Sequence, residues 1–243
     1  MKAARRNVRP SAPASQTAAR STGVPGKKRV FLVDDHPFMR AGLAQLIERQ
    51  PDLDFCGEAG NAADAFRDMA RAAPDLVLAD ITMPGRSGLE FIKDLSAKYP
   101  GLVILVVSMH DEAIYAERAL RAGARGYIMK EAGGENLLAA IRQVLRGEIY
   151  VSPRMAAIIL DGLSARRPRG SSSPIERLTD REFEIFRLIG QGKSTRDIAE
   201  TLHLSPKTVD VHRSHIKEKL GLAGATALVH RAVRWVEALG SGA

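Results

Sequence analysis

Between residues 29 and 146, short apolar runs alternate five times with stretches in which apolar residues recur at helical spacing. The apolar runs lie near 29–34, 53–59, 75–80, 102–107 and 126–129, and the helical stretches near 37–49, 61–72, 88–98, 111–122 and 134–146. Runs this short and this apolar are typical of strands buried in a parallel sheet. Five such units with short connections predict an α/β fold, a five-stranded doubly wound parallel sheet covered by helices on both faces.

Three acidic residues stand where two of these runs end. Asp34 and Asp35 follow the first run, and Asp80 closes the third. The Met-Pro-Gly segment after Thr82 cannot continue a strand, so we expect Asp80 at the carboxyl end of one. In open α/β sheets, that edge is where ligands bind. If the two strands are neighbours, the three carboxylates converge and must bind a cation or shift their pKa values.

A hydroxyl and an ammonium group stand at the ends of the last two runs. Ser108 follows the fourth run and Lys130 follows the fifth. Taken singly, each Asp could be a Mg²⁺ ligand, one of a general acid/base pair in an enzyme, or an ordinary turn residue. The whole set suits a phosphoryl group carried by Asp80. Mg²⁺ and Lys130 would neutralise its developing charge, and Ser108 would bond a phosphoryl oxygen.

The chain changes character after residue 150. A short helix is expected around 154–161, and the segment from Ser164 to Pro174, rich in Arg, Ser, Gly and Pro, predicts a flexible linker. We therefore divide the chain into a basic arm over 1–28, an α/β domain over 29–150, a linker with a short helix over 151–177 and a helical domain over 178–243. The arm has almost no large apolar side chains, so we expect it to be disordered.

The C-terminal domain is expected to hold four helices. Thr179 opens a capping box for the first, and Ser194 starts the second. Ser205 caps the third and Pro206 suits its first position, and a fourth helix spans 225–239. A helix, a short turn and a second capped helix indicate a helix-turn-helix.

Charge and composition narrow the class of protein. The net charge of +8 is unevenly placed: residues 1–29 carry +8, residues 30–150 carry −5, residues 151–177 carry +3 and residues 178–243 carry +2. An acidic domain flanked by basic segments indicates nucleic acid as a partner. The single cysteine, Cys56, excludes an internal disulfide framework and fits a reducing compartment. No apolar run approaches the ~20 residues of a membrane span, so we expect a cytoplasmic protein with no membrane partner.

On these motifs, residues 29–150 resemble the receiver domain of two-component response regulators. The matching segments are 33–37 (Val-Asp-Asp-His-Pro), 80–85 (Asp-Ile-Thr-Met-Pro-Gly), Gly88, Ser108 and 126–130 (Gly-Tyr-Ile-Met-Lys). The resemblance implies a flavodoxin-like fold in which Asp80 accepts a phosphoryl group from a sensor histidine kinase.

The resemblance also assigns roles to neighbouring residues. Asp34, Asp35 and Asp80 would hold Mg²⁺ together with the main-chain carbonyl of Thr82. Tyr127 would be the aromatic residue that moves inward as Ser108 moves toward the phosphate. One departure from the family pattern is Glu131, where many receivers have proline after the lysine, and it leaves the geometry of that loop open.

The C-terminal domain resembles the LuxR-type helix-turn-helix of the NarL/FixJ group. The matching segments are 178–182 (Leu-Thr-Asp-Arg-Glu), 192–194 (Gly-Lys-Ser), 198–199 (Ile-Ala), 204–209 (Leu-Ser-Pro-Lys-Thr-Val) and 212–221 (His-Arg-Ser-His-Ile-Lys-Glu-Lys-Leu-Gly). The resemblance implies that the third helix enters the major groove of double-stranded promoter DNA. The residues that would contact DNA are Lys207, Thr208, Asp210, Val211, His212, Arg213, Ser214 and Lys217. By motif position Lys207, His212 and Lys217 suit phosphates, and Asp210, Val211 and Ser214 suit base edges.

Together the two resemblances imply a phosphorylation-controlled transcriptional regulator. It would be no enzyme beyond promoting its own phosphoryl transfer and dephosphorylation. Phosphorylation of Asp80 would promote homodimerisation and promoter binding, and two copies would offset the modest +2 charge through avidity. RNA polymerase is a further candidate partner.

Two other interpretations stay open. A phosphatase with an Asp nucleophile also uses carboxylates, Mg²⁺ and Lys, but it normally pairs two acids at one strand end, where Ile81 and Thr82 follow Asp80 here. A DNA-binding protein whose receiver only dimerises would not need the intact set of acids, hydroxyl and lysine.

Overall fold

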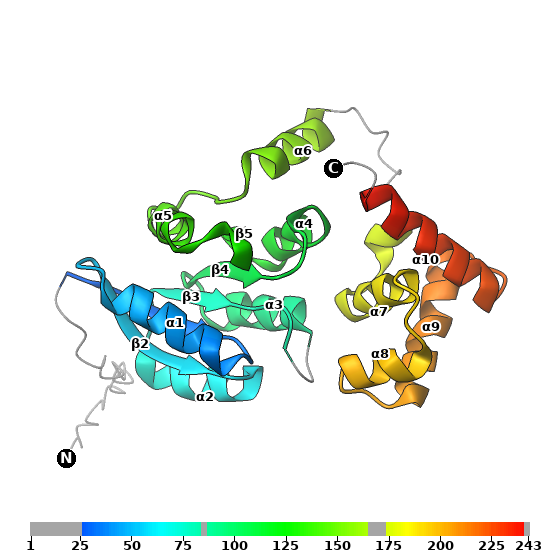
Figure 1. Cartoon of the computed structure of the whole chain (residues 1–243), viewed down its shortest axis with the longest axis horizontal. Helices are drawn as coiled ribbons and strands as arrows, with labels where there is room; N and C mark the ends of the chain where they lie inside the picture. The colour runs from blue at the N-terminus through cyan, green and yellow to red at the C-terminus, as the bar shows by residue number, and fades with distance from the viewer. Residues whose placement is uncertain (1–25, 84–86, 165–173, 241–243) are drawn as a thin grey trace, which may run out of the picture.

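The structure is a computed structural model that describes residues 26–83, 87–164 and 174–240. Figure 1 shows an α/β part, built from the first half of the chain, beside a smaller helical part built from the C-terminal residues. The predicted arm lies almost entirely outside the described residues, as do Pro84, Gly85 and the middle of the predicted linker. The predicted domain boundaries therefore stay predictions.

The α/β part is built on five parallel strands in the order β2-β1-β3-β4-β5. They are β1 (Lys28–Val33), β2 (Leu53–Ala59), β3 (Leu76–Ala79), β4 (Val103–Ser108) and β5 (Gly126–Met129). The order confirms the doubly wound sheet, and it makes β1 and β3 neighbours, as the converging acids require. Three strand ends differ by one residue from the expectation: β1 and β3 stop just before Asp34 and Asp80, and Ser108 is the last residue of β4.

Five helices cover the two faces of the sheet. They are α1 (Pro37–Glu48), α2 (Ala62–Ala72), α3 (Gly88–Lys98), α4 (Glu112–Ala122) and α5 (Gly134–Leu145). Alternate residues of each strand enter two separate cores. Val30 and Leu32 pack with α1 and α5, and Phe31 and Val33 pack with α2, α3 and α4. Removing these side chains from water is the main force that holds the sheet and its two helical layers together.

Gly88 of the receiver motif has a steric reason to be glycine. A Cβ at this position would lie 2.3 Å from the backbone of Ile81, the residue after Asp80. Any side chain would therefore push the start of α3 away from the loop that carries Asp80. This contact ties the first turn of α3 to the candidate site.

The C-terminal part is all helical. After α6 (Pro153–Ser164) and the 3-10 turn η2 (Pro174–Arg177) come α7 (Asp180–Gly190), α8 (Thr195–Thr201), α9 (Pro206–Leu220) and α10 (Ala225–Gly240). Thr179 and Ser194 both form capping boxes, and Ser205 accepts from the N–H of Thr208, so the predicted helix starts are confirmed. Among the described helices, none is both long and apolar enough to span a membrane.

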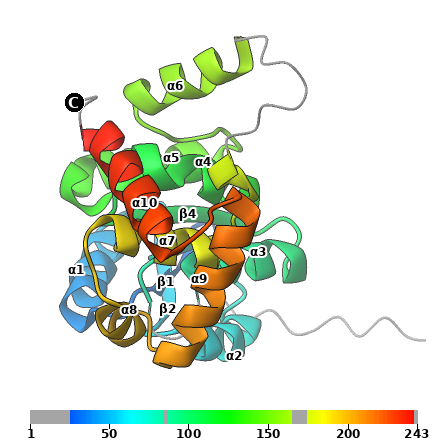
Figure 2. The same cartoon turned by 90° about the vertical axis from the view of Figure 1, so that its right-hand side faces the viewer.

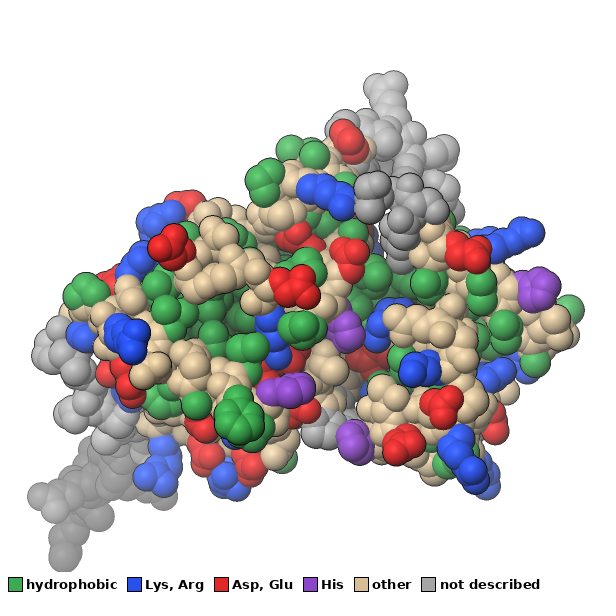
Figure 3. Space-filling model, viewed as in Figure 1, with side chains coloured by type: hydrophobic (Ala, Val, Ile, Leu, Met, Phe, Trp, Pro, Cys, Tyr) green, Lys and Arg blue, Asp and Glu red, His purple; other side chains and the backbone are tan. Residues whose placement is uncertain are grey.

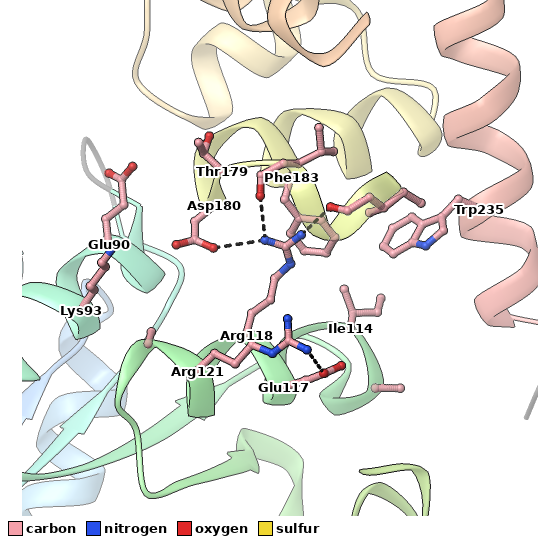
Figure 4. Close-up of a pocket in the computed structure, with 14 residues that line it drawn as sticks. Glu90, Lys93, Ile114, Glu117, Arg118, Arg121, Thr179, Asp180, Phe183 and Trp235 are labelled. Carbon is pink, nitrogen blue, oxygen red and sulfur yellow. Dashed lines mark hydrogen bonds and ion pairs between the residues drawn. The ribbon is translucent and has the colours of Figure 1, made fainter. Parts of the chain in front are cut away.

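The two parts are packed against each other through α4 and α7. The ring of Tyr115 on α4 meets the ring of Phe183 on α7 edge to face, with centroids 5.6 Å apart. The guanidinium of Arg118 lies 3.9 Å from the centre of the Phe183 ring and donates hydrogen bonds to the carbonyls of Ile175 and Leu178 (Figure 4). One contiguous apolar core runs through both parts as a result.

A second contact joins α7 to the loop that follows the third strand. Ser87 Oγ donates a 2.8 Å hydrogen bond to Glu184 Oε1, and both side chains are buried. Arg181 lies 2.8 Å from the other oxygen of Glu184 and compensates its charge. Because Ser87 lies only seven residues after Asp80, this contact connects the helical part to the loop nearest the candidate site.

Candidate phosphoacceptor site and DNA-binding helix

Four of the predicted site residues meet at the carboxyl edge of the sheet. Val33 pairs with Ala79 and Ser108 pairs with Met129, so Asp34, Asp80, Ser108 and Lys130 stand at neighbouring strand ends. Asp34, Asp80 and Ser108 are 3%, 2% and 0% exposed. Burial of this many polar groups at one edge is costly unless they satisfy one another or bind a ligand.

Lys130 bridges two of the acids. Its Nζ lies 2.6 Å from Asp34 Oδ2 and 2.7 Å from Asp80 Oδ2, and its side chain is only 3% exposed. Burial by itself would lower the pKa of Lys130, but the hydrogen bonds to Asp34 and Asp80 outweigh it and raise the pKa. The ammonium therefore stays charged at neutral pH, beside the oxygens where negative charge would build up during phosphoryl transfer.

Asp80 is held by its own loop as well as by Lys130. Its Oδ1 accepts a 2.9 Å hydrogen bond from the N–H of Thr82. Burial raises the pKa of Asp80, while the hydrogen bonds from Lys130 and from Thr82 oppose that rise. The Asp80 carboxylate is therefore fixed in orientation, shielded from water and close to the Lys130 ammonium. These properties suit a nucleophile, because a phosphorylated Asp80 carries more negative charge than Asp80 itself.

The acids can also hold a metal ion. Asp34, Asp35, His36 and Asp80 can each bring one ligand atom within 4.8 Å of the others. Asp35 Oδ1 is buried and accepts no hydrogen bond within the described residues, although His36 Nδ1 lies 2.8 Å away. A buried carboxylate oxygen without a hydrogen bond fits an oxygen-seeking cation such as Mg²⁺. The predicted ligand role of the Thr82 carbonyl stays a prediction.

His36 is a residue whose place the sequence did not reveal. Its N–H donates 2.8 Å to Asp34 Oδ1, and its ring nitrogen Nδ1 lies 3.3 Å from the same oxygen. In sequence it resembles any loop residue before a helix, because its pairing depends on a backbone bend and leaves no periodic signal. The structure makes it the outermost member of the acidic set, 64% exposed.

Ser108 and Tyr127 are linked through the backbone of His110. The N–H of His110 donates 3.1 Å to Ser108 Oγ, and the hydroxyl of Tyr127 donates 2.8 Å to the carbonyl of His110. Tyr127 is fully buried. The ring is therefore packed inside the fold, and its movement on phosphorylation stays a prediction. The loop after Lys130 forms a 3-10 turn, Lys130–Ala132.

A row of rings leads from this site to the helical part. His110 stacks on Tyr115 at 5.1 Å, Tyr115 meets Phe183 at 5.6 Å, and Phe183 meets Trp235 at 5.4 Å. Burial lowers the pKa of His110 to about 4, so its ring is neutral near pH 7 and stacks as an uncharged aromatic. No sequence pattern predicts this row, because its members come from separate elements and carry no shared motif.

The predicted DNA-binding helix is α9. Val209 and Ile216 are fully buried, as expected for its inner face. Of the eight candidate residues, Lys207, Asp210, Val211 and Ser214 are exposed, and Thr208, His212, Arg213 and Lys217 are partly buried. In Figure 2, α9 lies in front of α7, on the side away from the sheet. The receiver therefore leaves the outward face of α9 open.

Two of the candidates have structural contacts of their own. Arg213 donates 2.9 Å to the hydroxyl of Thr195 at the start of α8, which fixes α8 against α9. Ser214 Oγ donates 3.1 Å to the carbonyl of Asp210 within the helix. On the face shown in Figure 3, Lys and Arg side chains of the C-terminal helices are mixed with acidic ones, in keeping with the modest charge of this part.

A doubly wound sheet with buried acids, a hydroxyl and a lysine at one edge, joined to a helix-turn-helix, defines a signal-receiving protein that acts on DNA. Comparison with known families agrees on both halves. Residues 30–142 match the family model of the response regulator receiver domain, and residues 176–232 match that of the bacterial regulatory proteins of the luxR family.

Relatives match this chain over most of its length and nearly all of theirs. The oxygen regulatory protein NreC of Staphylococcus carnosus is 33% identical over 210 residues, which cover 85% of this chain and 97% of NreC. NreC of Staphylococcus aureus strain MRSA252 is 35% identical over the same shares. The chain therefore belongs to the two-component response regulators that carry a receiver domain and a LuxR-type DNA-binding domain.

Solved structures support the fold of each part. A LuxR-family response regulator from Aurantimonas sp. SI85-9A1 is 36% identical, with a TM-score of 0.53 over 56% of this chain and 98% of that one. RcsB of Salmonella enterica serovar Typhimurium, solved on a promoter, is 24% identical, with a TM-score of 0.57 over 84% of this chain and 97% of RcsB. The second likeness shows the fold alone.

Proposed function

We propose that this response regulator is switched by phosphorylation of Asp80 by a sensor histidine kinase. The observation that carries the proposal is Lys130, whose ammonium lies 2.6 Å from Asp34 and 2.7 Å from Asp80 in a buried site. A structural ion pair would need one acid, whereas this lysine contacts two and Asp35 lies in the same group of metal-binding side chains. This excess of carboxylates suits a cation and a phosphoryl group.

In the proposed transfer, one bond forms as another breaks, and groups in the site offset the charge that develops. A carboxylate oxygen of Asp80 attacks the phosphorus of a phosphohistidine, the phosphorus–nitrogen bond breaks, and the imidazole of the kinase leaves with the bonding electrons. Asp80 becomes an acyl phosphate. Mg²⁺ held by Asp34, Asp35, Asp80 and the Thr82 carbonyl would offset charge on the phosphoryl oxygens. Lys130 would shift from the Asp80 carboxylate to a phosphoryl oxygen, and Ser108 would donate to another.

We propose further that phosphorylation frees α4 from α7 and pairs two copies on promoter DNA. In the structure α4 is occupied by its contacts with Phe183 and η2, so that face cannot meet a second copy. Docking fixes how the two domains are oriented relative to each other. It does not cover the outward face of α9, where the candidate DNA contacts Lys207, Asp210, Val211 and Ser214 are exposed. RcsB of Salmonella enterica serovar Typhimurium was solved bound to a promoter in the presence of the phosphomimetic BeF₃⁻, and we propose the same kind of DNA-bound state for this chain.

The phosphate donor acetyl phosphate tests the function directly. We expect the full chain with Mg²⁺ to incorporate phosphate, to become dimeric in sedimentation experiments and to bind its promoter more tightly. If acetyl phosphate changes neither DNA affinity nor dimerisation, the receiver would instead be only a dimerisation module. Steady turnover of phosphomonoesters would support the phosphatase interpretation. Recruitment of RNA polymerase and action in the cytoplasm belong to the same proposal.

Replacing Lys207 with Ala tests the assignment of α9. Lys207 is exposed in the first turn of α9, and we propose that it neutralises a phosphate. We expect Lys207→Ala to weaken binding to all sequences by a similar factor and to reduce the slope of log affinity against log salt by about 1. Electrophoretic mobility shifts over a salt series measure this slope. Lys98→Ala on α3 removes the same charge from the receiver and should leave the slope unchanged.

A further inference from the structure

A second group of metal-binding side chains lies outside the phosphoacceptor site, between α7 and α9. Glu182, His212 and His215 can each bring one ligand atom within 4.8 Å of the other two. Glu182 comes from the first turn of α7, and the two histidines come from the middle of α9. Because they are three residues apart, both rings project from one side of the helix, with centroids 6.5 Å apart.

Glu182 is anchored through one of its two oxygens. Its side chain is 4% exposed, and Oε2 accepts 2.8 Å from the N–H of Thr179 and lies 2.6 Å from Lys219 Nζ. The other oxygen, Oε1, lies 3.9 Å from His215 Nδ1, which is too far for a hydrogen bond. The capping box and the lysine therefore fix the carboxylate while Oε1 faces the histidine.

His212 supplies a nitrogen that the fold leaves unsatisfied. Its Nδ1 is buried and makes no hydrogen bond within the described residues. A neutral imidazole keeps a free lone pair on one ring nitrogen, which can bind a metal ion. A buried nitrogen without a hydrogen bond costs free energy, and a metal ion would recover it.

We propose that Glu182, His212 and His215 bind a divalent transition-metal ion, Zn²⁺ foremost, that links α7 to α9. Two imidazoles, one carboxylate and a water complete the tetrahedral set that zinc accepts, whereas Mg²⁺ and Ca²⁺ prefer oxygen ligands. Ligand atoms of a tetrahedral zinc lie about 3.4 Å apart. The ligand atoms here lie within 4.8 Å of one another, so small side-chain rotations would bring them to that spacing. His215 is 54% exposed and has room to make that movement.

The surroundings limit how tightly the ion binds. Lys219 is bonded to the same carboxylate, and Arg181, whose positive charge acts on His212, is paired with Glu184. These cations oppose a divalent ion, so we expect weaker binding than at a structural zinc site. Binding of the ion would keep His212 from contacting DNA phosphates. The ion would lie next to the face of α9 that carries Asp210, Val211 and Ser214. The inference is independent of the proposed phosphorylation.

Titration of the full chain with Zn²⁺ tests the site. The buffer contains millimolar Mg²⁺, which occupies the acidic set of the receiver, and the chain carries no histidine tag. We expect about one equivalent of Zn²⁺ by isothermal titration calorimetry, and a melting temperature that rises when Zn²⁺ is added. His215→Asn should lower the affinity by about tenfold or more and remove the rise.

Three further variants locate the ion. His215→Asp supplies a carboxylate, another zinc ligand, and should keep most of the affinity. His230→Asn, at an exposed histidine of α10, and His36→Asn, in the receiver, should bind Zn²⁺ as the unaltered chain does. No uptake of Zn²⁺, uptake that His215→Asn leaves unchanged, or uptake that depends on His36 would each overturn the proposal.

Discussion

Asp80→Asn is expected to abolish stable incorporation of phosphate from acetyl phosphate or from a phosphorylated kinase. The amide that replaces the carboxylate cannot form an acyl phosphate, while it can still accept the hydrogen bond from the N–H of Thr82. Incorporation is measured with radiolabelled donor and by intact-mass spectrometry. The loss should be complete, because Asp80 is the one carboxylate among the described residues that both Lys130 and the Thr82 backbone orient.

The same variant should fold. Burial raises the pKa of Asp80, so the folded state binds its proton more tightly than the unfolded chain does. Such an acid favours the folded state at low pH, and that contribution is lost as pH rises through the folded pKa. At neutral pH the ionised Asp80 therefore costs stability, and we expect the melting temperature of Asp80→Asn to be no lower than that of the unaltered chain.

Asp111→Asn is the matched control. It makes the same change at the N-cap of α4, a position that Asn fills as well as Asp. This control should incorporate phosphate normally. Normal incorporation by Asp80→Asn, or a loss in both variants, would remove Asp80 from its proposed role.

Arg118→Ala is expected to raise the DNA affinity of the unphosphorylated chain by about tenfold. The side chain holds η2 and α7 against α4 by hydrogen bonds to two carbonyls and a 3.3 Å contact with Asp180, and it covers the Phe183 ring. Losing these contacts removes free energy that favours the docked state, and a shift of about 1.4 kcal/mol is tenfold in population. Binding to promoter DNA without a phosphate donor measures the effect.

Lys93→Ala is the control for this substitution. Lys93 is an exposed cation on α3 that lines the same cavity between the two parts, about 720 Å³ in volume (Figure 4). It should leave DNA affinity unchanged. If Arg118→Ala does the same, docking of α7 on α4 does not restrain DNA binding, and dimerisation alone would have to account for the switch.

The local patterns of the sequence predicted most of the fold. Strand runs ending in acids, a hydroxyl or a lysine placed Asp34, Asp80, Ser108 and Lys130 at one edge, since the carboxyl ends of parallel strands meet there. Capping residues predicted helix starts in the C-terminal part to within a residue. These features depend on neighbours within a few residues, and the sequence displays them directly.

Contacts between distant elements were decided only by the tertiary structure. Ser87 and Glu184 are 97 residues apart, and Arg118 and Asp180 are 62 apart, and neither pair stands out in sequence. The same holds for the pairing of His36 with the acids and for the approach of Glu182 to two histidines of α9. The sequence alone determined which groups reach the edge of the sheet, because backbone periodicity is local. Which side chains meet across the two parts depends on how whole helices pack, and packing is a property of the folded chain.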